Sequence, residues 1–281
     1  MTLSARNFVF KAGIVISLLS LVMCVIVTIQ TAPLFVSMEE DAVSQITRRS
    51  EGVFQLLFGQ FLNTRLMAVN VCILVLALFS FLSVFLIYHF FEKTQSPEIL
   101  YVVFFALSLS PEMFRLLLPL GQVYEIPSLY SLMASRIILF FRHFGLFSLF
   151  TASIIAAGYE MQRQRAVIMC ILVPSLIIAL GVPIDTHRWD SSLNMLYGYI
   201  PIIRLIEACA FFFTASSFFI AGWSRSSRGF TFIGAGSLIA ILGRNILINA
   251  DAWAALFPGL ALLALGTWLI CVNLHKIYLW L

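Results

Sequence analysis

The chain has 281 residues, of which 61% are hydrophobic and only 11% are charged. Soluble globular domains are about 45 to 50% apolar and roughly 25% charged, so this composition excludes a water-soluble protein and predicts an integral membrane protein. The net charge of +4 comes from scattered arginines and lysines rather than from a basic surface, which argues against nucleic-acid binding.

Eight apolar stretches are long enough to cross a bilayer as helices. A crossing helix needs about 20 residues for a hydrocarbon core about 30 Å thick. The stretches cover residues 12–31, 66–91, 99–120, 129–157, 166–182, 193–222, 230–248 and 253–272. We therefore predict an all-α, polytopic membrane helix bundle. Residues 12–31 are alternatively a cleaved signal peptide, because Arg6 and Lys11 precede them; its removal would leave seven helices.

The lysines and arginines between the helices predict the orientation, because cytoplasmic loops carry an excess of them. With the N-terminus inside, the inner segments contain Arg6, Lys11, Lys93, Arg163, Arg165, Arg225, Arg228 and Lys276. The outer loops after the third and seventh helices contain neither lysine nor arginine, and the loop after the fifth contains only Arg188. The longer first loop has arginines, but acidic residues lie beside them. The pattern predicts an N-in, C-in protein.

Residues 37–65 are the longest segment between two predicted helices. Ser37 and Glu40 have the spacing of a helix-capping box, and further acidic residues suit the positive end of a helix. Apolar residues then recur at roughly helical spacing, which predicts an amphipathic helix on the outer face of the membrane. The chain is thus divided into an anchor helix (1–36), this outer-face helix (37–65) and a seven-helix body (66–281).

Charged residues inside the predicted helices are the main functional signal, because an ionisable side chain at membrane depth usually faces the bundle interior or a water-filled cavity. Glu112 and Arg115 form an i,i+3 pair in the third predicted helix, and Arg204 and Glu207 form another in the sixth. In the predicted orientation, both pairs place the arginine nearer the outer surface. The two pairs are expected to lie at similar depth.

Three further arginines have no carboxylate partner in their own helices. Arg136 and Arg244 are expected at about the same depth as the two pairs, with Asn245 beside Arg244. Arg142 and His143 lie deeper, where they would form the floor of a pocket, contact a carboxylate or pack in the core. The excess of positive charge needs an explanation.

Three explanations remain open. The charged residues lock the bundle structurally, with Arg136 and Arg244 reaching lipid phosphates; they form an outward-facing pocket for an anionic ligand or lipid headgroup; or Glu112 and Glu207 relay protons or ions. The binding hypothesis assigns the site to Glu112, Arg115, Arg136, Arg204, Glu207, Arg244 and Asn245.

Signatures of enzymes and cofactor sites are missing from the sequence. The five cysteines show no metal-binding spacing, and the histidines form no HExxH motif. Neither GxSxG nor a Walker A motif occurs. We therefore expect a non-enzymatic protein without a cofactor or metal site.

The layout of one N-terminal helix, a short outer helix and a seven-helix body is similar to that of bacterial seven-helix sensory input modules. This resemblance implies a receptor-like role. We predict a multi-pass protein of the bacterial inner membrane that binds an anionic small molecule or lipid headgroup and acts through a membrane or cytoplasmic protein partner. The alternative is a transporter, or its accessory subunit, whose substrate path the same cluster lines.

Overall fold

A computed structural model describes residues 3–47, 66–94, 96–125, 127–158 and 164–279. The helices are α1 (Leu3–Thr47), α3 (Leu66–Phe91), α4 (Glu98–Leu107), the 3₁₀ helix η1 (Ser110–Leu116), α5 (Leu117–Val123), α6 (Ser128–Ala156), α7 (Gln164–Gly181), α8 (Ile200–Ser224), α9 (Arg228–Ile248) and α10 (Trp253–Leu279). Two short antiparallel strands, β1 (Ile184–Trp189) and β2 (Met195–Tyr197), form a hairpin between α7 and α8.

Seven helical segments in the described part of the chain are long and apolar enough to cross a membrane. They lie in α1, α3, the continuous run from α4 to α5, α6, α8, α9 and α10. The protein is therefore an all-α, multi-pass membrane bundle, as its composition predicts. Helix α7 contributes a shorter apolar segment, Ala166–Gly181.

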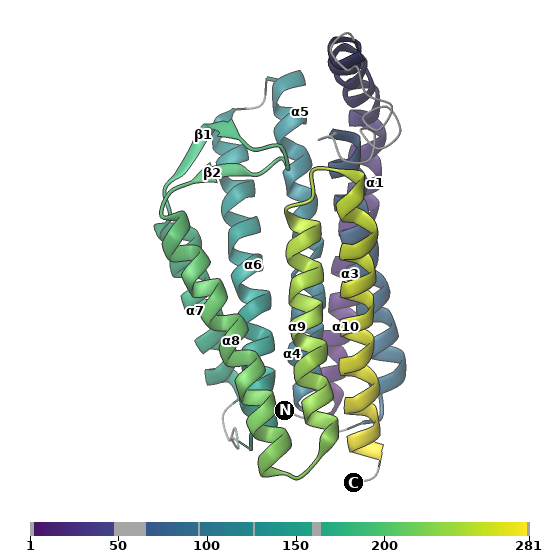
Figure 1. Cartoon of the computed structure of the whole chain (residues 1–281), viewed down its shortest axis with the longest axis vertical. Coiled ribbons are helices and arrows are strands. Elements are labelled where there is room, and N and C mark those ends of the chain that lie inside the picture. The colour runs from purple at the N-terminus through teal and green to yellow at the C-terminus, as the bar shows by residue number, and fades with distance from the viewer. Residues whose placement is uncertain (1–2, 48–65, 95, 126, 159–163, 280–281) are drawn as a thin grey trace.

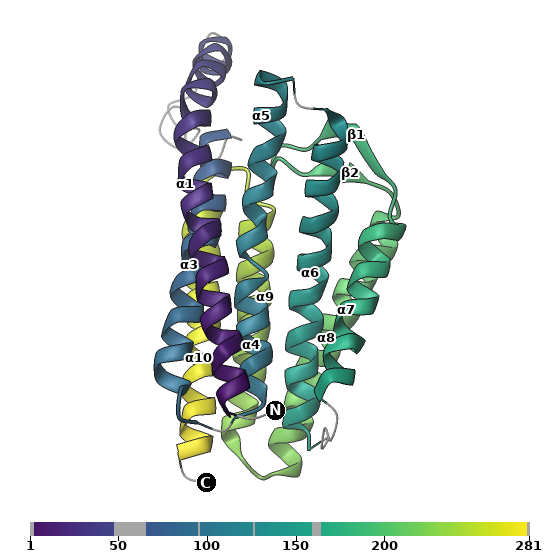
Figure 2. The same cartoon turned by 180° about the vertical axis from the view of Figure 1, so that it is seen from behind.

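Successive helices alternate in direction, so that both chain ends lie at one end of the bundle and the hairpin lies at the other (Figures 1 and 2). We call these the termini end and the hairpin end. Helices α6, α7 and α8 form one side of the bundle, and α1, α3 and α10 form the other, with α4 and α9 between them (Figure 2).

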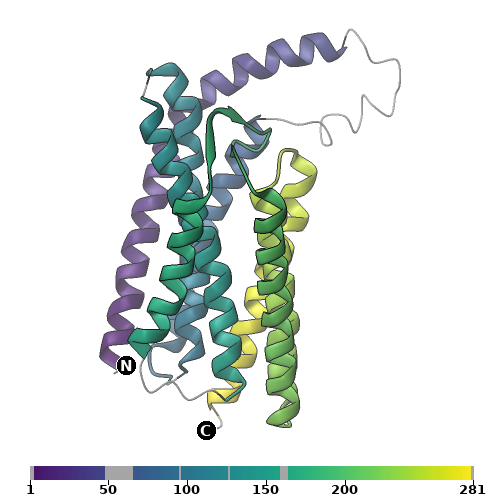
Figure 3. The ribbon, with the colours of Figure 1, turned by 90° about the vertical axis from the view of Figure 1, so that its left-hand side faces the viewer.

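The prediction that a separate helix begins at Ser37 was wrong. The structure has one continuous helix from Leu3 to Thr47, with Pro33 inside it. A helix that is already nucleated extends at low cost, whereas a new helix must pay for its first turn. The part beyond the proline leans away from the bundle at the hairpin end (Figure 3). The remainder of the expected outer-face helix, residues 48–65, lies outside the described residues.

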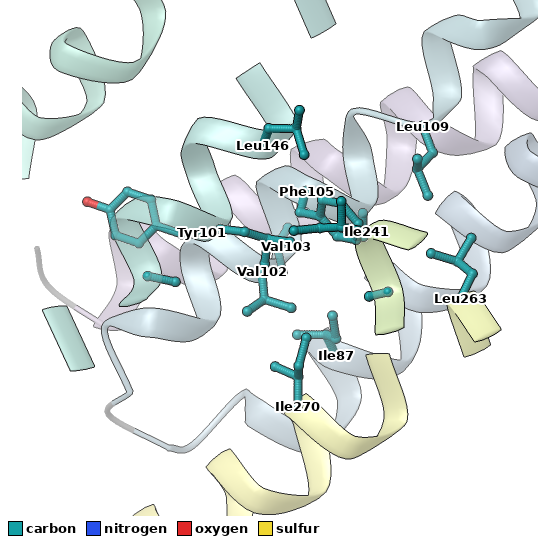
Figure 4. Packing of buried hydrophobic residues seen from close by; sticks show 14 of the residues in the cluster. Ile87, Tyr101, Val102, Val103, Phe105, Leu109, Leu146, Ile241, Leu263 and Ile270 are labelled. Carbon is teal, nitrogen blue, oxygen red and sulfur yellow. The ribbon is translucent and has the colours of Figure 1, made fainter. Parts of the chain in front are cut away.

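The core is built around α4, almost all of whose side chains are buried. Its Val102 and Phe105 belong to the same buried cluster as Leu146 of α6, Ile241 of α9 and Ile270 of α10 (Figure 4). Because these side chains reach α4 from both sides of the bundle, the helix that continues into the polar segment η1 is held firmly in place.

Helices α9 and α10 approach each other along small residues, which include Gly236 and Gly243 of α9 and Gly266 of α10. A Cβ atom added to Gly243 would lie 2.3 Å from the Leu263 nitrogen, and one added to Gly266 would lie 2.4 Å from the Ala240 nitrogen. Only glycine fits at these two positions, because the neighbouring backbone occupies the space of a side chain.

The predicted sixth span began too early. Residues 193–199 belong to the hairpin and its exit, and α8 begins only at Ile200, after Tyr199 with a positive φ of 57°. Their apolar character misled the prediction, because Leu193 and Met195 are buried against the bundle rather than exposed to lipid. The hairpin covers the bundle at this end (Figure 1).

Candidate functional site

A break in the third membrane segment presents the first charged residues of the site. Pro111 has no N–H to donate to the Leu107 carbonyl, so an α-helix cannot continue unchanged. The Ser110 hydroxyl donates to that carbonyl instead, at 2.9 Å, and the chain continues as the 3₁₀ helix η1. Within η1 both Glu112 and Arg115 are buried, with exposed fractions of 2% and 1%.

Glu112 binds an arginine from another helix more closely than its neighbour in η1. Arg142 of α6 donates from Nε to Oε1 and from Nη2 to Oε2, at 2.6 Å each. Arg115 donates from Nη1 to Oε2 at 3.4 Å, which confirms the predicted i,i+3 pair. The paired, planar contact with Arg142 is the geometry in which arginine holds a carboxylate most strongly. Glu112 therefore joins η1 to α6.

The hairpin turn, residues 190–194, inserts its oxygen atoms into the same cluster. Arg142 Nη2 donates to Asn194 Oδ1 at 2.7 Å, and Arg115 Nη2 donates to the Ser192 carbonyl. Ser192 and Asn194 are buried, and between them Leu193 belongs to the same buried apolar cluster as Leu116 of η1. The turn thus plugs the bundle above the arginines and supplies the acceptors that Glu112 does not.

Asp190 gives the turn its shape. Its Oδ1 accepts hydrogen bonds from the Ser192 N–H at 3.1 Å, the Ser192 hydroxyl at 2.9 Å and the Asn194 N–H at 2.8 Å. An aspartate that binds backbone N–H groups a few residues ahead is a common turn former. The turn is therefore held in shape by hydrogen bonds of its own, in addition to its contacts with the arginines.

Arg244 of α9 completes the buried cluster. Its Nη2 donates to the backbone carbonyl of Arg142 at 2.8 Å, and its Nη1 lies 3.4 Å from Oδ1 of Asn245. It also interacts electrostatically with the carboxylates of Glu207 and Glu112. With an exposed fraction of 1%, Arg244 is a charged core residue and not a side chain at the lipid interface.

Two predicted site residues, Arg136 and Arg204, lie apart from this cluster. Arg136 donates to the carbonyls of Ala179 and Leu180, both at 2.7 Å, and so binds the last turn of α7, where a positive charge is favourable. Arg204 is exposed, and within the described residues no ion pair joins it to Glu207. The second predicted i,i+3 pair is therefore not formed in the structure.

The cluster carries more buried positive charge than its one fully buried carboxylate balances. Arg115, Arg142 and Arg244 surround Glu112, while Asp190 and Glu207 are only partly buried. The Nε atoms of Arg115 and Arg244 are buried without a hydrogen-bond partner among the described residues. Guanidinium groups with unused donors are suited to the oxygens of a carboxylate or a phosphate.

One small cavity lies beside the cluster among the described residues. A cavity of about 20 Å³ lies between Arg142, Asn194, Tyr197 and the apolar residues of α6 and the hairpin. That volume holds about one water molecule. In this conformation the hairpin turn, rather than open space, occupies the region above the arginines.

Two features of the site were underestimated from the sequence. Arg142 was expected to form a pocket floor, contact a carboxylate or pack in the core and was not assigned to the site, yet it is the main partner of Glu112. The hairpin turn was not expected at the site, because its last two residues, Leu193 and Asn194, were assigned to the start of the sixth span. The signal for the turn was present, because an aspartate followed by two serines and an asparagine favours a compact turn. Within the described residues no group of histidine, cysteine or acidic side chains is arranged to hold a metal ion.

Comparison with known proteins identifies no relative of this chain. The chain matches no protein family model, and it shows no significant similarity to a curated protein or to a solved structure. Its function must therefore be argued from the geometry.

Proposed function

We propose that this protein is a receptor-like membrane subunit that binds an anionic ligand or lipid headgroup at the arginine cluster and acts through a protein partner. The observation that carries the proposal is the kind of acceptor that the buried arginines have. Arg115 and Arg142 donate to neutral oxygens of the hairpin turn rather than to a second buried carboxylate. A ligand carboxylate or phosphate would bind the same two guanidiniums more strongly, because its negative charge adds an ionic attraction and its oxygens match the paired donors of arginine.

Ligand binding and release of the turn are then the same event. The Ser192 carbonyl and Asn194 Oδ1 occupy the positions that ligand oxygens would take, so the ligand competes with the plug. Displacement of the turn moves β1 and β2 with it, because the turn joins the two strands. The hairpin connects directly to α7 and α8, so a change at the site reaches the surface of the bundle through these helices. A ligand shifts such an equilibrium only by its preference for one of the two states.

We further propose eight membrane crossings, with both chain ends in the cytoplasm of a bacterium and the protein in its inner membrane. The shorter α7 is the eighth crossing, and it runs from the termini end to the hairpin end (Figure 1). The loops at the termini end contain Lys93, Arg225 and Arg228, whereas residues 124–127 and 249–252 at the hairpin end contain no lysine or arginine. This distribution supports the orientation, which would open the site to the outside.

The test uses citrate, L-glutamate and inorganic phosphate as probes, at constant ionic strength with chloride as the reference. Tryptophan-monitored thermal unfolding of the detergent-solubilised protein reports binding, because a ligand that prefers the folded state raises the melting temperature. Asn194→Ala removes one hydrogen bond of the plug. Since such a bond contributes about 1 kcal/mol, the variant should bind an anion roughly fivefold more tightly while being less stable without it.

Matched controls separate binding from general salt effects. Arg204→Gln removes an exposed arginine outside the cluster and should respond to each probe like the unchanged protein. Arg244→Gln removes a cluster donor and should lose the response. Equal shifts in the unchanged protein and in all three variants would refute the binding proposal and favour a purely structural charge cluster.

A further inference from the structure

A second recess lies at the opposite end of the bundle from the arginine cluster. A groove of about 560 Å³ runs between α3 and α10, and its lining includes Phe79, Leu86, Phe90, Trp268 and Val272. Leu86, Phe90 and Trp268 are exposed by 49%, 59% and 61%. The volume lies within the range of about 300 to 1,000 Å³ that is common for ligand sites.

The length of the groove fits one leaflet of a bilayer. Its lining extends along α3 from Phe79 to Phe91 and along α10 from Ala264 to Lys276. Each stretch corresponds to about 18 Å of helix. A whole hydrocarbon core is about 30 Å thick, so the groove is close to half of it and lies in the half nearer the termini end. An acyl chain occupies one leaflet, so the length of the groove matches an acyl chain better than a whole transmembrane helix.

The walls of the groove are chemically suited to hydrocarbon. The Thr267 hydroxyl, one of its few polar groups, donates to the Leu263 carbonyl of its own helix at 2.9 Å, so this donor is already used. Most of the remaining lining is aromatic or aliphatic. The interior of the groove therefore offers packing contacts rather than hydrogen bonds.

Positive charge marks one end of the groove. Lys276, in the last turn of α10, is exposed where the lining reaches the termini end. His275 lies beside it, with its ring packed edge-on against Phe91 and its Nδ1 buried without a hydrogen-bond partner among the described residues. No acidic side chain is among the described residues that line the groove. This end is complementary to an anionic headgroup.

We propose that an anionic phospholipid of the leaflet at the termini end binds here, with an acyl chain between α3 and α10 and its phosphate beside Lys276. In the orientation proposed above this is the cytoplasmic leaflet, but the site itself depends only on the groove and its charge. It is separate from the arginine cluster and stands whether or not that cluster binds a ligand.

Native mass spectrometry of the detergent-solubilised chain tests this inference with dioleoylphosphatidylglycerol and dioleoylphosphatidylcholine, which have the same acyl chains. We expect one phosphatidylglycerol to be retained preferentially. Lys276→Gln should weaken its retention about fivefold, because a basic residue near a membrane surface contributes about that factor to the binding of anionic lipid. Lys93→Gln is the matched control, since Lys93 is exposed at the same end but does not line the groove.

Leu86→Trp tests the acyl part of the proposal by filling the groove, and should reduce the retention of both lipids; circular dichroism checks that the variant is folded. Equal retention of the two lipids by the unchanged protein would overturn the proposal. So would a Lys276→Gln variant that binds phosphatidylglycerol as well as the Lys93→Gln control does. Because Lys276 is exposed, its substitution should leave the fold intact and the result interpretable.

Discussion

Removal of the Glu112 carboxylate would leave three buried guanidiniums facing one another around a single neutral amide. In the structure Glu112 receives two hydrogen bonds of 2.6 Å from Arg142 and one of 3.4 Å from Arg115. Removing one partner of a buried pair typically costs about 3 to 5 kcal/mol, because the other charge stays buried and uncompensated. We expect Glu112→Gln and Arg142→Gln each to lower the free energy of unfolding by about 4 kcal/mol.

The double variant distinguishes a real pair from two independent residues. When both groups are neutral, no unpaired charge remains between them, so Glu112→Gln/Arg142→Gln should cost less than the sum of the single changes, by about 2 to 3 kcal/mol. Reversible unfolding in mixed detergent micelles, followed by circular dichroism, measures all four proteins. Arg204→Gln, which is exposed, is the control and should change stability by less than about 0.5 kcal/mol. Strict additivity of the two substitutions would refute the view that Glu112 and Arg142 are the core of the cluster.

Other parts of the structure make equally definite predictions. Gly266→Ala should destabilise the protein by about 1 to 3 kcal/mol in the same assay, because the new methyl group meets the backbone of α9, whereas Gly181→Ala, with no atom within 4 Å, should be nearly neutral. Arg136→Gln should increase amide hydrogen exchange at the end of α7 without altering the response to anions, since among the described residues Arg136 donates to α7 carbonyls and lies apart from the cluster. Asp190→Ala should loosen the hairpin turn and lower the free energy of unfolding by about 1 to 3 kcal/mol, because it removes an oxygen that accepts three hydrogen bonds. An unchanged melting temperature would contradict this role of Asp190.

The long helices could be predicted because their cause is local. A run of about 20 apolar residues is sufficient for a membrane helix whatever surrounds it, and the runs from Leu66 and Trp253 start where the structure starts α3 and α10. The close packing of α9 on α10 also follows from local composition, since glycines leave room for a neighbouring backbone. The hairpin did not follow, because Leu193 and Met195 are as apolar as lipid-facing residues and only their burial explains them.

The charged site was only partly predictable for a related reason. The spacing of Glu112 and Arg115 is a property of one helix and was identified correctly. The partnership of Glu112 with Arg142 joins residues 30 positions apart, and that of Arg142 with Asn194 joins residues 52 apart. Periodicity within a helix gives no information about which face of a distant helix it will meet.

The sequence by itself determined that this is a membrane protein and where most of its helices lie. It also determined that arginines are in excess within these helices. These properties could be predicted because the free energies of burying apolar and charged groups depend on residue type. The tertiary structure alone decided which arginines share Glu112 and which bind elsewhere. It places Arg142 and Arg244 in one buried cluster and Arg136 on the end of α7. It also fits the hairpin turn over the cluster, because buried guanidiniums must find oxygen acceptors and the packing of the helices determines which oxygens are within reach.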